Sequence, residues 1–234
     1  MSVRIAADPI VIGNWVRDSF NPGLDEISQG VTDANTAISM LEAKAPNLGI
    51  IRTNTASELQ ELGTSATTVL TKGATAVAQV VEAILSAGGS TTAVEIPETK
   101  TFALDGAMLE DGDVVEVDEP KFVAAAADIK AAHKKISTAC ESIKADLSAI
   151  SEDAWQGESR ESVVQVINKL IGEGAEPAWA EESANHDSGV VTPWAEPADQ
   201  DLQSVSSASL ANTCNSIFAV LNNIRTTDKA VSEA

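Results

Sequence analysis

Four stretches of the chain carry apolar residues at alternating steps of three and four, which is the spacing of one face of an amphipathic helix. The most regular stretch runs through Phe122, Ala126, Ile129, His133, Ile136, Cys140, Ile143, Leu147 and Ile150. The others follow Leu24, Ile27, Val31, Ala34, Ile38, Leu41, Ala45 and Leu48; Ile51, Thr55, Leu59, Leu62, Ala66, Val69, Gly73, Val77, Val80 and Ile84; and Leu210, Cys214, Ile217, Leu221, Ile224, Asp228 and Val231. Such a stripe stays on a partner helix along a shallow left-handed supercoil. The pattern therefore predicts a mainly α protein, an elongated antiparallel four-helix bundle.

Glycine and proline mark the boundaries of these helices. Asn21-Pro22-Gly23 precedes the first, Gly88-Gly89 ends the second, and Glu119-Pro120 introduces the third. The predicted order begins with an N-terminal extended segment over residues 1–20, a helical hairpin over 21–90 and an acidic β-meander insert over 91–120. A hairpin with a Trp-x-Gly turn over 121–174, an acidic tryptophan-bearing loop over 175–200 and a C-terminal helix over 201–234 follow. All of these segments are expected to belong to one bundle. Val3-Arg4-Ile5 and Ile10-Val11-Ile12 are candidate strand residues in the first segment.

The sequence pattern predicts no helix in two regions of the chain. Asp105-Gly106 and Asp111-Gly112 are hairpin-type turn pairs, and they predict the small β-meander. The acidic loop repeats proline, tryptophan, alanine and glutamate around Trp179 and Trp194. These two rings either pin the loop onto the bundle, which is the favoured interpretation, or serve as exposed anchors for a protein partner.

The negative charge of the chain limits the classes of molecule that it is expected to bind. The formal net charge is −20, and most of it lies in residues 91–120, with nine acids against one lysine, and residues 173–201, with eight acids and no lysine or arginine. Such a field repels phosphate, so nucleic-acid binding is not expected. The most apolar run, residues 74–87, is short and contains Gln79 and Glu82, so no membrane span is predicted. The N-terminus lacks the long apolar stretch of a classical signal peptide.

Candidate reactive residues fall on the predicted core stripes. His133, Cys140 and Cys214 would need to converge with a fourth ligand to hold a metal, and no diagnostic spacing supplies one. A Cys140–Cys214 disulfide stays open, because sequence does not show whether the two thiols lie at the same height. His186 stands beside Asp187 and Ser188, too close in sequence for a catalytic triad. We therefore predict no catalytic residue, no metal and no cofactor, and a protein that is not an enzyme.

Trp155-Gln156-Gly157 lies between the third helix and a shorter one rich in valine and isoleucine. Gly157 supplies the backbone freedom for a reversal, and Trp155 would cap the open end of the core. This arrangement resembles the WXG100 family, the helical-hairpin substrates and partners of type VII secretion, over about residues 121–171. The resemblance implies export as a folded helical unit. The chain departs from the family pattern in three ways: it has no tyrosine for the Tyr-x-x-x-Asp tail motif, its helix after Gly157 is short, and a β-insert separates its halves.

Two functions follow as expectations. The first is a non-catalytic helical bundle acting by protein–protein interaction, with Trp155, Gly157, Trp179 and Trp194 as its candidate contact residues, exported without a classical signal peptide. The alternative is a structural or assembly subunit of a bacterial, archaeal or viral particle, which would associate with itself. A cytoplasmic location stays open in both.

Overall fold

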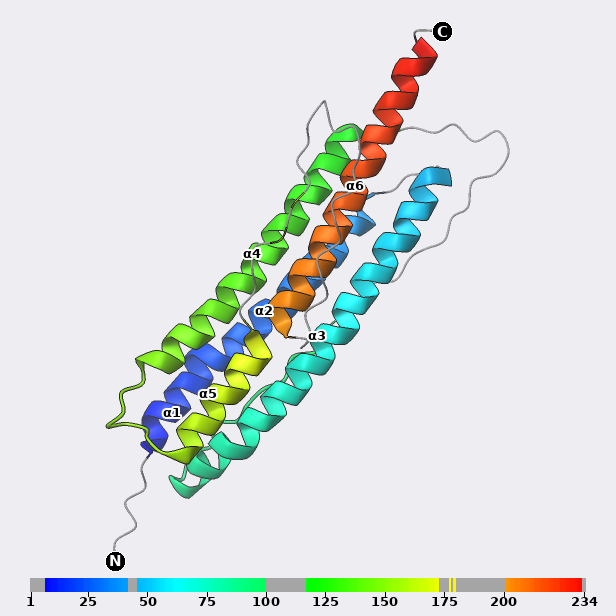
Figure 1. The fold of residues 1–234 in the computed structure, drawn as a ribbon. Coiled ribbons are helices and arrows are strands. Elements are labelled where there is room, and N and C mark those ends of the chain that lie inside the picture. The colour runs from blue at the N-terminus through cyan, green and yellow to red at the C-terminus, as the bar shows by residue number, and fades with distance from the viewer. Residues whose placement is uncertain are drawn as a thin grey trace, which may run out of the picture.

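The computed structural model describes residues 7–41, 46–99, 117–172, 177, 179 and 201–232, apart from the side chains of residues 46–55 and 231. These residues are mainly helical and build a long bundle, which confirms the predicted helical character (Figure 1). The core is one continuous cluster of buried aliphatic side chains drawn from every helix.

The first rod begins earlier than the sequence pattern indicates. Helix α1 (Pro9–Trp15), a π-helical turn η1 (Val16–Phe20) and helix α2 (Asn21–Ser39) follow one another without a gap. The Asp8 carboxylate accepts a hydrogen bond from the Ile10 N–H at 2.9 Å, and Pro9 occupies the first turn. This cap starts a helix at residue 9. The predictions of a strand at Ile10–Ile12 and of an extended segment up to residue 20 are therefore wrong for residues 9–20.

Pro22 lies inside this rod and does not start it. Proline has no N–H and its ring clashes with the carbonyl four residues earlier, so a helix interior must adjust around it. The adjustment is the turn η1, in which the Asn21 N–H bonds to the Val16 carbonyl, five residues back. A π turn widens the helix by one residue and lets the chain pass the proline without ending.

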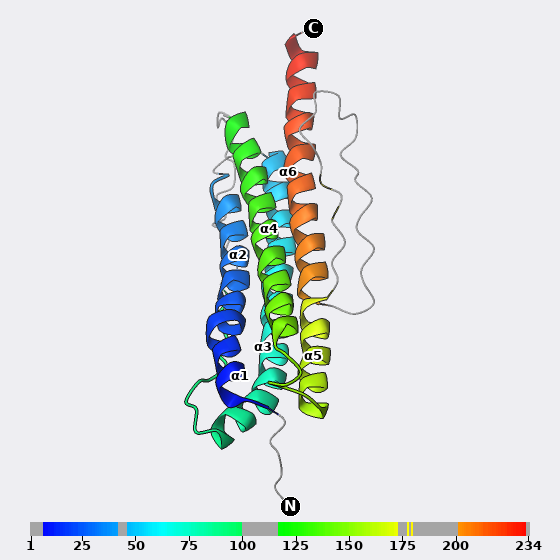
Figure 2. The ribbon, with the colours of Figure 1, turned by 90° about the vertical axis from the view of Figure 1, so that its left-hand side faces the viewer.

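The remaining helices are α3 (Pro46–Ala87), α4 (Glu119–Ala149), α5 (Glu158–Ile171) and α6 (Leu202–Ser232). Helices α3 and α4 run opposite to the first rod, and α5 and α6 run parallel to it (Figures 1 and 2). The main contacts are α2 with α4, α3 with α6, and α4 with α6, so each of these neighbours is antiparallel. The C-terminal turns of α6 project beyond the other helices.

Helices α5 and α6 lie end to end as one broken rod (Figure 2). At the break, Gly172 has a φ of +75° and packs so closely on Asp201 that a Cβ there would overlap the carboxylate. The Lys144 ammonium donates to the Gly172 carbonyl at 2.9 Å and offsets the negative end of α5. Helix α3 contacts both α5 and α6. Gly172 and Asp201, which are far apart in sequence, are thus in direct contact at the break between α5 and α6.

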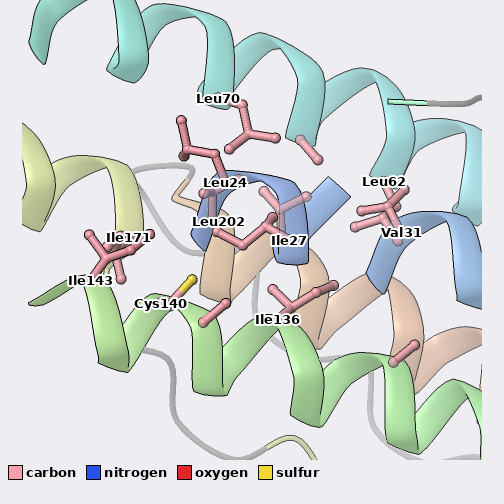
Figure 3. Close-up of a cluster of buried hydrophobic side chains, with 14 of the residues drawn as sticks. Leu24, Ile27, Val31, Leu62, Leu70, Ile136, Cys140, Ile143, Ile171 and Leu202 are labelled. Carbon is pink, nitrogen blue, oxygen red and sulfur yellow. The ribbon is translucent and has the colours of Figure 1, made fainter. Parts of the chain in front are cut away.

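The predicted core stripes hold for α4 and shift within α3. All nine predicted positions of α4 are buried, from Phe122 to Ile150. On α3, the predicted positions Leu59, Leu62, Ala66, Gly73 and Val77 are buried, whereas Val69, Val80 and Ile84 are half-buried. Their places in the core are taken by Leu70, Ala74, Val81 and Leu85. A straight helix drifts away from a 3.5-residue repeat. The partner of α3 also changes along its length, from α6 to α5 and α1. Figure 3 shows Leu62 and Leu70 pointing from α3 toward core side chains of α2.

Residues 90–99 form an extended strap along α2 in place of the first part of the predicted meander. The Asn21 side chain pairs with this backbone twice, donating to the Ala93 carbonyl at 2.9 Å and accepting from the Glu95 N–H at 3.0 Å. One heptad on, the Ser28 hydroxyl donates to the Glu98 carbonyl at 2.9 Å. Because helix side chains satisfy the strap, residues 91–99 need no neighbouring strand. The predicted strands of the meander lie almost wholly at 100–116, outside the described residues.

One part of the described chain, Ala56–Ala87, is long and apolar enough to cross a membrane by length and composition, with a mean hydropathy of 1.3. The prediction of no membrane span considered residues 74–87 alone, whereas the longer helix passes this test. The same segment contributes Leu59, Leu70 and Val81 to the bundle core, although only 28% of its most apolar stretch is buried.

Cys140 and Cys214 are buried free thiols, so the disulfide left open by the sequence is not formed. The Cys214 Sγ lies 3.9 Å from the Ala126 carbonyl oxygen, and Ala126 and Cys140 are separated by about 21 Å of helix rise. Burial raises the pKa of Cys140 to about 12 and that of Cys214 to about 11.

We expect neither thiol to react with Ellman's reagent at pH 8 in the folded protein and both to react in 8 M urea. Rapid labelling in native buffer would contradict this burial.

Candidate functional site

Two glycines bring α2 and α4 unusually close together. A Cβ on Gly30 would lie 2.6 Å from Ile136 Cγ1, and a Cβ on Gly23 would lie 2.5 Å from Ile143 Cγ1 and Cδ1. The glycines are seven residues apart on α2, and the isoleucines are seven apart on the antiparallel helix α4. Each isoleucine therefore fills a hole that only the absence of a side chain provides. Figure 3 shows Ile136 and Ile143 pointing from α4 into the core.

An open groove follows the outer side of this seam. It consists of two hollows of about 500 and 390 Å³, which share Ala131 and Lys135 and therefore adjoin. Small side chains contribute much of the lining, namely Pro22, Gly23, Ala37, Ala131, Ala132, Thr138, Ala139 and Ser142. The half-exposed Met40 closes the upper end. From residue 18 to residue 40 the groove follows about 33 Å of helix rise. We call it the α2–α4 groove.

Charged groups form the walls of the α2–α4 groove. The acids are Asp18, Glu26, Asp33, Asp128 and Asp146, and the bases are Lys134 and Lys135. The Lys135 Nζ lies 2.9 Å from an Asp33 carboxylate oxygen and 4.0 Å from one of Glu26. Burial alone would raise the pKa of Asp33, but hydrogen bonds from Lys135 and Gln29 and the charge of Lys135 outweigh it and lower that pKa. The hydrogen bond to Asp33 raises the pKa of Lys135.

Trp155 and Gly157 build a tight corner between α4 and α5. The Trp155 side chain is fully buried, and its Nε1–H donates to the Ser159 hydroxyl at 3.0 Å. Its backbone forms an isolated antiparallel bridge with Ala7. Gly157 has a φ of +89° and precedes the first turn of α5. The indole is thus a plug at the end of the core, and it presents no surface for a partner to touch in this structure.

Trp179 lies against α4. Its ring meets the His133 ring edge to face, with centroids 5.2 Å apart, and the Lys130 ammonium lies 5.9 Å from the indole centroid. The ring is half-buried and packs on the core, as the pinning interpretation predicts. Trp194, the fourth candidate contact residue, lies outside the described residues.

His133 belongs to the interface between α4 and α6. Its Nε2 lies 2.8 Å from the Ser207 hydroxyl, and both residues are buried, with 7% and 2% of their surface exposed. A serine beside a histidine is one half of a nucleophilic site, but this pair sits inside the packed core, as the sequence predicts for His133. No cluster of three metal-ligating side chains occurs within the part of the chain that the structure describes.

The sequence-based reasoning placed its candidate contacts on tryptophans and missed the α2–α4 groove. Gly23 was interpreted as part of a helix entry, and Gly30 was not singled out. The signal that could have found the groove is the recurrence of small residues seven positions apart at Gly23, Gly30 and Ala37. No protein-family model, curated protein or solved structure matches the chain.

Proposed function

We propose that the protein is a non-catalytic, antiparallel four-helix bundle that acts by binding another protein along the α2–α4 groove. The observation that carries this proposal is the groove itself. Among the described residues, α2 and α4 meet over Gly23 and Gly30, and an open hollow lined by residues of both helices follows their seam. Small residues let a third helix approach two others closely, which is how helical interfaces are built.

Site-specific crosslinking in the source cell tests this proposal. A photo-crosslinking residue replaces Thr138, which is exposed and lines the groove, or Gln79, which is exposed on α3. We expect a discrete protein adduct from position 138 and none from position 79, because only the first lies where the partner binds. Equal adducts at both positions, or none at position 138, would contradict the proposal.

We further propose export of the folded bundle, supported by the resemblance of Trp155-Gln156-Gly157 and its flanking helices to the WXG100 family. We expect Trp155→Ala to abolish appearance of the protein outside the cell. The control is Leu62→Ala, a core truncation away from the corner, since Leu62 is also fully buried. If both variants are exported to the same degree at equal cellular levels, the corner serves the fold alone.

The alternative, a subunit of a larger particle, makes a different prediction in solution. A particle subunit forms a large species whose fraction rises with protein concentration, and light scattering detects it. The exported bundle is instead expected to form no large species over the same concentration range, because its net charge of −20 opposes self-association.

A further inference from the structure

We propose that the occupant of the α2–α4 groove is a basic amphipathic helix from another protein. This inference rests on the proposed function and adds the chemistry of the partner. Three properties of the groove support it: the sign of its charge, its length, and the size of the side chains that line it.

The charge of the groove selects a basic partner. The lining carries five carboxylates and two ammonium groups, and the Arg17 guanidinium pairs with Asp18 at 2.6 Å, so the net charge here is −2. Glu26 and Asp33 are two helical turns apart on α2, and Asp128 and Asp146 are five turns apart on α4, so each pair lies on one face of its helix. A second copy of this chain would bring carboxylates against carboxylates, on top of a net charge of −20 per chain. A helix bearing lysine or arginine on its flanks meets acids on both walls.

The fold already shows how an ammonium group is held here. Lys135 places its Nζ between Glu26 and Asp33, at 4.0 and 2.9 Å. Asp128 and Asp146 form no ion pair with any described residue, although Asp146 accepts a hydrogen bond from Ser19. These two carboxylates are therefore open to lysines of a partner, which would repeat on α4 the contact that Lys135 makes with α2.

The dimensions of the groove suit a single helix. About 33 Å of rise corresponds to about 22 helical residues. The small side chains of Pro22, Gly23, Ala131 and Ala139 leave room for leucine-sized side chains to enter from one face of the partner. The expected partner thus has a narrow stripe of leucine and alanine with basic residues on either side.

Fluorescence anisotropy with a defined peptide tests the inference on the purified full-length chain. The probe is a labelled 22-residue amphipathic helix of leucine, alanine and lysine, and its counterpart has glutamate in place of every lysine. We expect the lysine peptide to bind, the glutamate peptide not to bind, and the affinity to fall as salt rises.

A pair of charge-matched variants separates groove binding from general attraction to an acidic protein. The groove variant carries Glu26→Gln, Asp33→Asn, Asp128→Asn and Asp146→Asn. The control variant neutralises four exposed acids elsewhere, with Glu61→Gln, Asp153→Asn, Glu158→Gln and Glu161→Gln. We expect the groove variant to bind the lysine peptide at least about fourfold more weakly and the control to bind as the parent does. Circular dichroism verifies that both variants are folded.

A second substitution blocks the groove without removing an acid. Ala131 is exposed and lines both hollows, so Ala131→Arg fills the groove with a long cationic side chain and should weaken binding as well.

Equal losses in the groove and control variants, or binding of the glutamate peptide, would overturn the inference. If the peptide result is negative while crosslinking at position 138 succeeds, the groove binds a protein of other chemistry, and only the present inference fails. If crosslinking fails as well, the proposed function fails with it.

Discussion

Replacing Trp155 with alanine is expected to lower the free energy of unfolding by about 3–5 kcal/mol, the range for removing a buried tryptophan side chain. The indole has no exposed surface and fills the end of the core at the corner between α4 and α5. Its removal leaves a cavity and frees the Ser159 hydroxyl, which accepts from the indole at 3.0 Å. In a chain of this size the loss corresponds to a fall of roughly 6–20 °C in melting temperature, measurable by circular dichroism at 222 nm.

Two further variants separate the parts of this effect. Ser159→Ala removes only the hydrogen-bond acceptor and should cost about 0.5–1.5 kcal/mol. Ile10→Ala shortens a side chain that is 72% exposed and should stay within about 0.5 kcal/mol of the parent. A loss below about 1 kcal/mol for Trp155→Ala would mean that the ring is not the plug described here.

The second large effect is expected at the glycine seam. Gly30→Leu should lower the free energy of unfolding by about 2–3 kcal/mol, because even a Cβ there would lie 2.6 Å from Ile136 Cγ1 and 3.2 Å from the Ala132 carbonyl oxygen. Leucine is the better helix former by nearly 1 kcal/mol, and that gain is too small to offset the forced separation of α2 and α4. Urea denaturation measures the difference.

A double mutant ties this loss to the contact between the two helices. Ile136→Ala empties the space that the new side chain needs, so the combined variant Gly30→Leu with Ile136→Ala should be more stable than the sum of the single effects by about 1–3 kcal/mol. Asp25→Leu, at an exposed position of α2, is the control for adding a leucine to this helix. Strict additivity of the two substitutions would show that Gly30 and Ile136 do not share one site.

The seam also connects the fold to the proposed function. Gly23 packs against Ile143 of α4 and also lines the α2–α4 groove. Gly30→Leu would force apart α2 and α4, the two walls of the groove, so it should disturb the lysine-peptide site as well as stability. Trp155 lines neither hollow, so Trp155→Ala should leave peptide binding intact wherever the variant is still folded.

The sequence by itself determined the helices and most of their buried faces. The stripe from Phe122 to Ile150 could be read directly, because an amphipathic helix repeats its apolar face at a spacing that local sequence alone reveals. The helix boundaries at Gly88 and Glu119 were also predicted from the sequence, since glycine and proline act through their own backbone. The burial of His133 and of both cysteines followed from their places on the stripes.

Only the tertiary structure decided the features that depend on which helix lies beside which. Pro22 reads as a helix start, but a π turn before it keeps the rod intact. The stripe of α3 changes its register where its neighbour changes from α6 to α5 and α1. The role of Gly30 depends on Ile136, a residue more than one hundred positions away in the chain. The walls of the α2–α4 groove come from two helices that are far apart in the chain, and no local sequence pattern contains both of them.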